Sequence, residues 1–499
     1  MRRLLPTVLA ALLAVLLAPA AAPASMSQES IFEDEGLIIG QGNLDAVNEM
    51  AALGADTIRT VVFWRDVAPS ATAKKVPAGF DATDPASYDA AGWDRYDAFV
   101  RRADELGVNV LFTPSSPIPR WASQCKGVSA KKAASCKPNV KLFEGFVKVL
   151  GQRYSGTYAD ENGPVLPRVE RWSIWNEPNV PAWLQPQYTG SAGSPKPESA
   201  IRYRSLALAA LRSLRASGHG SDHLLLAETA PLGRTSGPVS DRQAPPVDFI
   251  NTLLCLDSKG RKLRGSAAKR ASCKKAPKFQ VSGFAHHPYA RGGSQPPLSP
   301  ASKGEIRISN ISKLFGILDD AARAGRLPKR LPVWFTEFGF QTNPPDRVLG
   351  VKPKAQATYL NQSDYLASKI GRVKSVAQYK LVDDQNQASF QTGLKYFGTQ
   401  KKKPGYAAYR LPIWVGRKGG SLRVYGQLRP AAAGATEQVE VQRKAGKGGW
   451  TTVKTVTVKS ATGQFVTRTG RKSGVWRLRW TPSSGGDTLT SRVADVGNA

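Results

Sequence analysis

Short apolar segments alternate with longer segments of helical periodicity between about residue 36 and residue 410. The apolar segments predict eight strands, at 36–42, 57–63, 108–113, 169–175, 223–228, 280–286, 331–337 and 376–383. The intervening segments predict helices, for example at 93–106, 142–154, 199–216, 308–324 and 354–371. This alternation is typical of parallel strands joined by crossover helices.

Eight strand–helix units over this length favour an α/β fold, the (β/α)8 TIM barrel, which we place at residues 30–412. An open doubly wound sheet is the alternative. That fold is expected to carry a Gly-rich phosphate loop after an early strand, and the sequence has none.

The pattern changes near residue 412, where short alternating stretches appear at 421–427, 437–443, 450–458 and 475–480. Clusters of Gly, Ser and Lys separate them. This pattern predicts a small all-β sandwich of the immunoglobulin-like type, which we expect to be an accessory domain at residues 413–499. The segment holds 15 basic and 4 acidic side chains, an excess of 11 positive charges.

The first 24 residues predict a cleaved signal peptide. Arg2 and Arg3 precede the apolar run 4–17, and Ala22-Pro23-Ala24 resembles a cleavage site. A retained anchor is the alternative, but the run is shorter than the roughly 20 residues of a spanning helix. No later stretch is long and apolar enough to span a bilayer. We therefore expect a secreted or cell-envelope-associated protein with no transmembrane segment after cleavage.

The chain has four cysteines, and their order favours two local disulfides, Cys125–Cys136 and Cys255–Cys273. Export makes disulfides chemically reasonable, although four cysteines allow three pairings and spacing alone does not choose among them. A zinc site is the competing interpretation. It is disfavoured because there is no C-x-x-C motif and no His beside any Cys.

The chain is strongly basic, with 70 Lys and Arg against 38 Asp and Glu and a formal net charge of +32. A surface this basic attracts polyanions. Export argues against nucleic acid as the natural partner, whereas anionic cell-envelope polymers or acidic polysaccharides fit. The alternative is a solvated basic surface without a dedicated partner.

Two carboxylates lie at predicted strand ends, where TIM barrels gather functional side chains. The fourth strand leads into Glu177 and the seventh into Glu337, each with aromatic neighbours. Two carboxyl groups facing one pocket are the requirement for cleaving a glycosidic bond. One donates a proton to the leaving oxygen, and the other attacks the anomeric carbon or activates water.

The motifs around these carboxylates resemble clan A of the retaining TIM-barrel glycoside hydrolases, especially its cellulase-like family 5 and xylosidase-like family 39. Trp175-Asn176-Glu177-Pro178 resembles the acid/base motif, which implies that Asn176 binds a sugar 2-hydroxyl. Thr336-Glu337-Phe338-Gly339 resembles the nucleophile motif. The resemblance covers residues 36–410 and implies a catalytic barrel.

Two further motifs support the resemblance. Arg59 resembles the strand-two arginine that hydrogen-bonds the nucleophile and keeps it ionised. His287-Pro288-Tyr289 resembles the strand-six motif whose tyrosine contacts the nucleophile. We therefore expect Arg59 and Tyr289 to lower the pKa of Glu337.

Other residues are candidates for binding substrate. Three loop tryptophans are possible platforms for sugar rings or parts of the loop packing: Trp64, Trp121 and Trp183. Glu228 either binds substrate or caps the following helix. The last predicted strand lacks the tryptophan that many relatives place under the sugar.

The sequence as a whole predicts a hydrolase that cleaves O-glycosidic bonds in a poly- or oligosaccharide by double displacement, with Glu177 as acid/base and Glu337 as nucleophile. We expect it to need no cofactor and no metal, since no third ligand accompanies His286 and His287. The alternatives are a non-catalytic saccharide-binding protein and a basic cell-envelope protein on a barrel scaffold.

Overall fold

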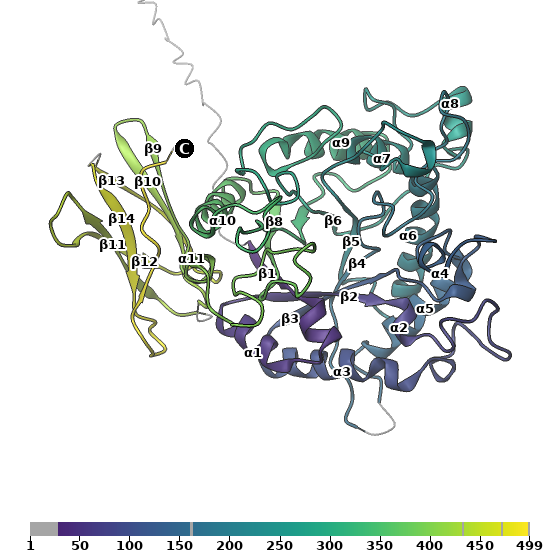
Figure 1. Ribbon diagram of the computed structural model, residues 1–499, viewed down its shortest axis with the longest axis horizontal. Coiled ribbons are helices and arrows are strands. Elements are labelled where there is room, and N and C mark those ends of the chain that lie inside the picture. Colours follow the sequence, from purple (N-terminus) through teal and green to yellow (C-terminus); the bar gives the residue numbers. More distant parts are fainter. Residues whose placement is uncertain (1–27, 160–162, 432–433, 471–472, 498–499) are drawn as a thin grey trace, which may run out of the picture.

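A computed structural model describes residues 28–159, 163–431, 434–470 and 473–497. The predicted signal peptide, 1–24, lies outside the described residues. Eight parallel strands close into a barrel in chain order, which confirms the predicted TIM barrel (Figure 1). The strands are β1 (Glu29–Glu33), β2 (Thr57–Phe63), β3 (Asn109–Ser115), β4 (Arg171–Ser173), β5 (His223–Thr229), β6 (Gly283–His286), β7 (Val333–Phe335) and β8 (Val373–Tyr379).

Helices surround the barrel, and the longer ones coincide with the predicted periodic segments. Local signals fix their starts: the Asn139 side chain accepts hydrogen bonds from the first backbone amides of α5, and Pro353 opens α10. The helices are α1 (Leu44–Ala52), α2 (Trp64–Val67), α3 (Ala90–Glu105), α4 (Ala130–Ala133), α5 (Val140–Arg153), α6 (Glu198–Ala216), α7 (Pro246–Leu253), α8 (Gly265–Arg270), α9 (Ser312–Arg323), α10 (Pro353–Ser368) and α11 (Pro404–Arg410).

The prediction of the first strand at 36–42 is wrong. The strand that closes the barrel is β1, and Gly36–Gly40 forms a single π-helical turn beyond it. The polar residues of β1 conceal it, because Glu33 points into the barrel and forms an ion pair with Arg59. The apolar residues Ile38 and Ile39 are buried against the core from this turn rather than from a strand.

Residues 413–497, which we call the β domain, form two antiparallel sheets and confirm the predicted small all-β unit. One sheet has the order β13-β10-β9 and the other β12-β11-β14-β15. A separate core, including Trp476 and Trp480, fills the space between them. The strands are β9 (Ile413–Lys418), β10 (Ser421–Gln427), β11 (Glu437–Lys444), β12 (Thr451–Val458), β13 (Gln464–Gly470), β14 (Val475–Trp480) and β15 (Leu489–Thr490).

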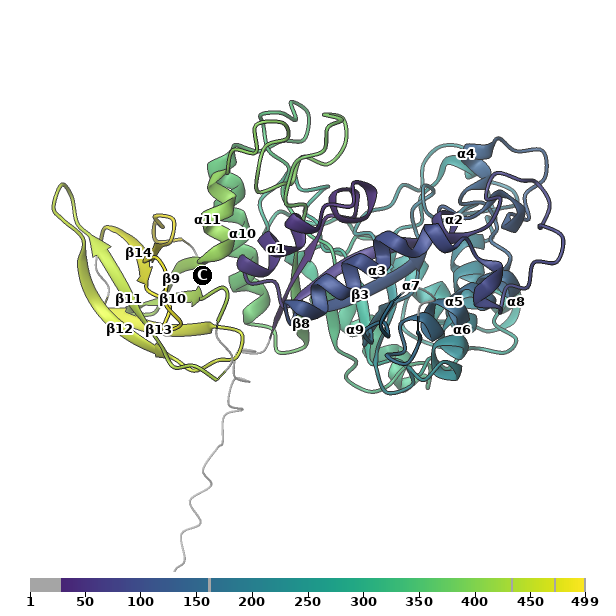
Figure 2. The same ribbon diagram turned by 90° about the horizontal axis from the view of Figure 1, so that it is seen from below.

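The β domain packs against the barrel beside α10 and α11 (Figure 2). Tyr365 of α10 stacks on Trp414, with ring centres 6.2 Å apart, and lies 5.9 Å from the ring of Tyr425. A buried ion pair, Arg429–Asp364 at 3.6 Å, crosses the same junction. Aromatic packing and a buried charge pair therefore join the two units.

Both predicted disulfides are confirmed. Cys125–Cys136 and Cys255–Cys273 are bonded, with Cα–Cα distances of 5.9 and 5.8 Å. In the described part of the chain, no helix has both the length and the apolar character needed to cross a bilayer.

Candidate active site

The two predicted catalytic carboxylates lie just beyond the C-terminal ends of β4 and β7. Glu337 follows β7 by two residues, and Glu177 follows β4 by four. The backbone before Glu177 is strained, with φ of 65° at Trp175 and 36° at Glu177. The backbone N–H of Glu177 donates to the carbonyl of Glu228 at 3.1 Å, which fixes this turn over the barrel mouth.

Glu177 and Glu337 face each other across His287. The ring Nδ1 of His287 lies 3.0 Å from Glu177 Oε1 and 3.5 Å from Glu337 Oε2. One oxygen of each carboxylate lies within 4.8 Å of the other. The two carboxylates therefore face the same part of the barrel mouth.

The surroundings of the two carboxylates differ. Glu337 accepts a hydrogen bond from Tyr289 Oη at 2.9 Å, and its side chain is 9% exposed. Glu177 has His287 as its side-chain partner, and its side chain is 17% exposed. Glu337 is therefore the more enclosed carboxylate and has more donors.

Arg59 lies fully buried beneath the pair, and its hydrogen bonds do not go to Glu337 as the resemblance implied. Its guanidinium donates to Glu33, to both oxygens of Glu228 and to Asn176 Oδ1, the last at 2.7 Å. Glu337 Oε2 is an ion-pair neighbour at 3.6 Å. Arg59 thus joins β1, β5 and the loop after β4 into one charged network.

Glu228 takes neither of its two predicted roles. It is completely buried, binds Arg59 through both oxygens and accepts a hydrogen bond from Ser173 Oγ at 2.6 Å. Asn176 is also buried, and Arg59 holds its carbonyl oxygen. Glu228 therefore positions the site from below, and the contact of Asn176 with a sugar 2-hydroxyl stays a prediction.

The buried charges shift each other's pKa values. Burial alone would raise the pKa of Glu228, but Arg59 and His287 lower it to about 2. Burial alone would lower the pKa of His287, but the charge of Glu337 and the neighbouring carboxylates of Glu177 and Glu228 raise it to about 10. His287 is therefore an imidazolium at neutral pH that donates Nδ1–H toward the catalytic pair.

The expectation of a lowered pKa for Glu337 is wrong. Burial and the charge of Glu177 raise the pKa of Glu337, and His287, Arg59 and Tyr289 offset this only in part. Burial also raises the pKa of Glu33 well above its usual range, against the pull of Arg59. Desolvation, which the sequence does not show, outweighs the cations here.

Two of the three predicted tryptophan platforms are wrong. Trp64 has no exposed surface and stacks on Phe146, with ring centres 5.5 Å apart. Trp121 is 6% exposed and donates its indole N–H to the carbonyl of Pro69. Trp183 is half-buried and stacks on Phe63. Of these three, Trp183 alone keeps a face that a sugar can reach.

Sequence reasoning missed Phe390, which lies in the loop after β8. Its ring is 38% exposed and lies 6.4 Å from that of Tyr289 and 5.3 Å from that of Tyr379. It lines a groove of 580 Å³ formed by the loops after β6, β7 and β8. Phe390 is eleven residues beyond the end of its strand, so no strand-end motif marks it.

Glu177, His287 and Glu337 also form the one described group whose geometry could hold a metal ion. A metal would have to displace the proton on Nδ1 of His287. The raised pKa of that imidazole opposes this displacement. The charges of Glu177, His287 and Glu337 therefore favour hydrogen bonding among the three groups over binding of a metal ion.

Comparisons with known proteins give structural neighbours only, since no family model and no curated protein matches the chain. A family 39 glycoside hydrolase from Bacteroides cellulosilyticus WH2 is 13% identical, with a TM-score of 0.48 over 90% of this chain and 81% of that one. The family 1 β-glucosidase from Thermotoga maritima is 16% identical, with a TM-score of 0.46 over 73% and 84%.

A calcium-binding mutant of β-glucuronidase 2 from Bacteroides uniformis is 10% identical, with a TM-score of 0.44. The alignment covers 95% of this chain but 46% of that longer one. These identities are too low to transfer residue roles, so the roles of Glu177 and Glu337 rest on the geometry at the barrel mouth.

Proposed function

We propose that the protein is a retaining glycoside hydrolase that cleaves O-glycosidic bonds in a poly- or oligosaccharide. The observation that carries this proposal is the approach of Glu177 and Glu337 to within 4.8 Å at the C-terminal mouth of the barrel. The two groups follow β4 and β7, which are not neighbours in the barrel. Nothing in packing alone requires two carboxylates to meet there.

In the first step, the carboxylate of Glu337 attacks the anomeric carbon. The bond from that carbon to the leaving oxygen breaks, and the proton of Glu177 passes to that oxygen. The product is a glycosyl ester of Glu337. In the second step, Glu177 takes a proton from water, the water oxygen attacks the anomeric carbon, and the ester bond breaks to restore the Glu337 carboxylate.

The assignment of roles follows from the contacts of each carboxylate. Double displacement needs one carboxyl group charged as the nucleophile and the other protonated as the acid. The negative charge is better stabilised on Glu337, which has Tyr289, Arg59 and His287 as neighbours. In this assignment Glu337 is the nucleophile, and Glu177, the more exposed of the two carboxyl groups, supplies the proton to the leaving group.

We also propose that the enzyme acts outside the cytoplasm. The N-terminal sequence has the organisation of a signal peptide, and the two disulfides fit an oxidising compartment.

Binding of a neutral sugar ring would use Trp183 and Phe390 as apolar faces. No cofactor is required for either step.

Azide rescue of two alanine variants tests the proposal. Without Glu177, activated aryl glycosides still form the glycosyl-enzyme, and azide should replace water and give a glycosyl azide of retained configuration. Without Glu337, azide should enter the vacated space and give a glycosyl azide of inverted configuration. Glu177→Ala should also cost about 10²–10⁴-fold on substrates with poor leaving groups.

Exchanged stereochemistry in the two variants would exchange the two roles. A wild-type protein that binds saccharides but hydrolyses none of a broad panel of aryl glycosides and polysaccharides would instead favour the non-catalytic alternative. NMR of the azide products gives the configuration directly.

A further inference from the structure

Four basic side chains gather where the β13-β10-β9 sheet meets the end of α10. Arg423 lies directly opposite Arg468 in the strand register, and Lys418 lies opposite Ser421, two residues along from Arg423. Residues two apart on a strand share a face, so these three side chains point the same way. Lys369 caps the C-terminus of α10. We call these four residues the junction cluster.

Packing places Lys369 beside the same face of the sheet. Tyr425 follows Arg423 on this face and packs 5.9 Å from the ring of Tyr365. The Lys369 ammonium lies 4.5 Å from the centre of that same ring. Burial lowers the pKa of Lys369, and the positive charges of Arg423 and Lys418 lower it further. The cations are thus close enough to repel one another.

The junction cluster has no carboxylate partner within the described residues. The described ion pairs of the β domain are Arg429–Asp364 and Arg479–Glu440, and neither includes a member of the cluster. The Nε of Arg423 is buried without a hydrogen-bond partner. Like charges opposite each other in a sheet are destabilising, and a buried unpaired donor is costly. An anionic ligand would relieve the repulsion among the cations.

We propose that the junction cluster is a binding site for the carboxylate groups of an acidic polysaccharide. Its cations are spaced about 5 Å across the strands and about 7 Å along them, which presents a row of charge to an extended polyanion. The arginine fork donates two parallel hydrogen bonds to a carboxylate. This surface is separate from Glu177 and Glu337, so the inference goes beyond the proposed catalysis.

A saccharide fits this surface better than a nucleic acid. Proteins that bind single-stranded nucleic acid stack bases on exposed aromatic rings. The aromatic residues at the junction, Tyr365, Trp414 and Tyr425, are all buried. The cluster therefore offers charge and hydrogen bonds but no stacking platform.

The test uses the full chain and polygalacturonate, with neutral dextran, duplex DNA and anionic lipid vesicles as comparisons. The cluster variant replaces all four cations with glutamine: Lys369→Gln, Lys418→Gln, Arg423→Gln and Arg468→Gln. It should bind polygalacturonate about tenfold more weakly than the wild type at low salt. Salt should weaken wild-type binding as well. The effect should be the same in a Glu337→Ala background, which separates this site from catalysis.

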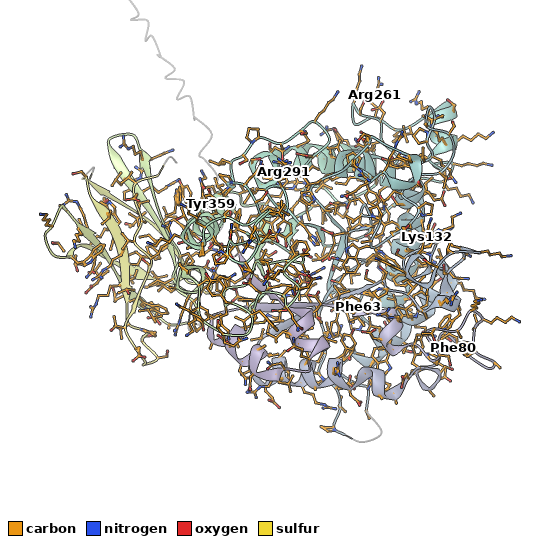
Figure 3. All side chains as sticks on the ribbon, viewed as in Figure 1. Phe63, Phe80, Lys132, Arg261, Arg291 and Tyr359 are labelled. Atoms are coloured by element: carbon orange, nitrogen blue, oxygen red, sulfur yellow. A yellow bond between two sulfur atoms is a disulfide. The ribbon has the colours of Figure 1, made fainter. Side chains whose placement is uncertain are left out.

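The matched control removes four exposed cations elsewhere: Lys131, Lys132, Lys274 and Lys275. Figure 3 shows Lys132 on the side of the barrel away from the β domain. This control should change the affinity less than twofold. Because Arg423 is half-buried, its replacement could disturb folding. A second variant therefore changes only the exposed Lys369, Lys418 and Arg468. Thermal unfolding shows whether each of the two variants is folded.

Equal losses in the cluster variant and the control would show that diffuse charge is responsible and would overturn the proposal. The cluster variant could instead lose more of its affinity for DNA or for vesicles than for polygalacturonate. That result would assign the site to nucleic acid or to anionic lipid. A folded cluster variant that binds polygalacturonate as the wild type does would also reject it.

Discussion

The barrel mouth and the β domain differ in how their positive charges are paired. At the mouth, Arg59 and His287 are completely buried, and carboxylates surround both. In the junction cluster, Arg423 and Arg468 lie side by side with no carboxylate partner among the described residues. The first arrangement is closed and holds catalytic groups in place. The second is open and has capacity for an external anion.

A basic sequence can therefore contain two kinds of positive charge, one paired and buried and the other unpaired and exposed. The formal net charge of +32 counts every charged residue alike, whereas Arg59 and His287, the buried cations of the site, lie against carboxylates. Paired buried charges set geometry and pKa values, whereas unpaired exposed charges set long-range attraction. Changes to the paired charges should therefore have larger effects than changes to the weaker contacts.

The largest expected effect comes from Arg59→Met, which leaves Glu228 buried without its guanidinium partner. Breaking a buried ion pair on one side costs about 3–5 kcal/mol of unfolding free energy. Displacement of the catalytic pair should reduce kcat/KM at least about 100-fold. Urea unfolding and aryl glycoside kinetics measure the two effects. The exposed control Arg261→Met should change neither, and a stable, active Arg59→Met would contradict the network.

Removal of the whole β domain should cost less than one substitution at its junction. Arg429→Met keeps Asp364 buried but unpaired, at about 3–5 kcal/mol. Truncation after Pro412 exposes Asp364 to water and loses mainly the burial of Tyr365, about 1.5–3 kcal/mol. Both variants should retain kcat/KM on a small soluble glycoside, since no described residue of the β domain contacts Glu177 or Glu337. Thermal unfolding ranks them, and the reverse order would refute this account.

The pH dependence of stability should reveal the charged state of His287. Its pKa of about 10 in the folded protein lies above the usual 6.5, so its stabilisation is complete below pH 6.5 and disappears as the pH rises through about 10. Wild type should therefore lose its stability advantage over His287→Gln between pH 7 and pH 10. Urea titrations at three pH values measure this. The exposed control His223→Gln should track wild type throughout, and a constant wild-type advantage would show a neutral His287.

The sequence predicted the barrel and the two carboxylates at its mouth because these features leave local signals. Strand ends carry the motifs around Glu177 and Glu337, and helical periodicity marks the crossovers. The misplaced first strand shows the limit of this approach. Glu33 makes β1 look polar, because its partner Arg59 comes from another strand.

Other features depend on contacts between distant residues. Trp64 and Trp121 were candidate platforms because each follows a predicted strand, yet Trp64 packs on α5, and Trp121 packs on Trp64 and Phe80. The raised pKa of Glu337 depends on how deeply the barrel mouth excludes water. Neither burial nor desolvation can be inferred from spacing along the chain.

The smallest expected effect concerns Phe390, an exposed ring next to the catalytic network. If its face contacts a sugar, Phe390→Ala should lose one aromatic contact, about 0.5–1.5 kcal/mol, and raise KM for an oligosaccharide about fivefold. kcat should be unchanged, because this contact is the same in the ground state and the transition state. Phe397, which is 46% exposed in the same loop, supplies the matched control. Phe397→Ala should leave KM unaltered, since its ring has no described contact with Tyr289 or Tyr379. Equal KM values for the two variants would remove Phe390 from the substrate-binding surface and leave Trp183 as the aromatic face available to the sugar.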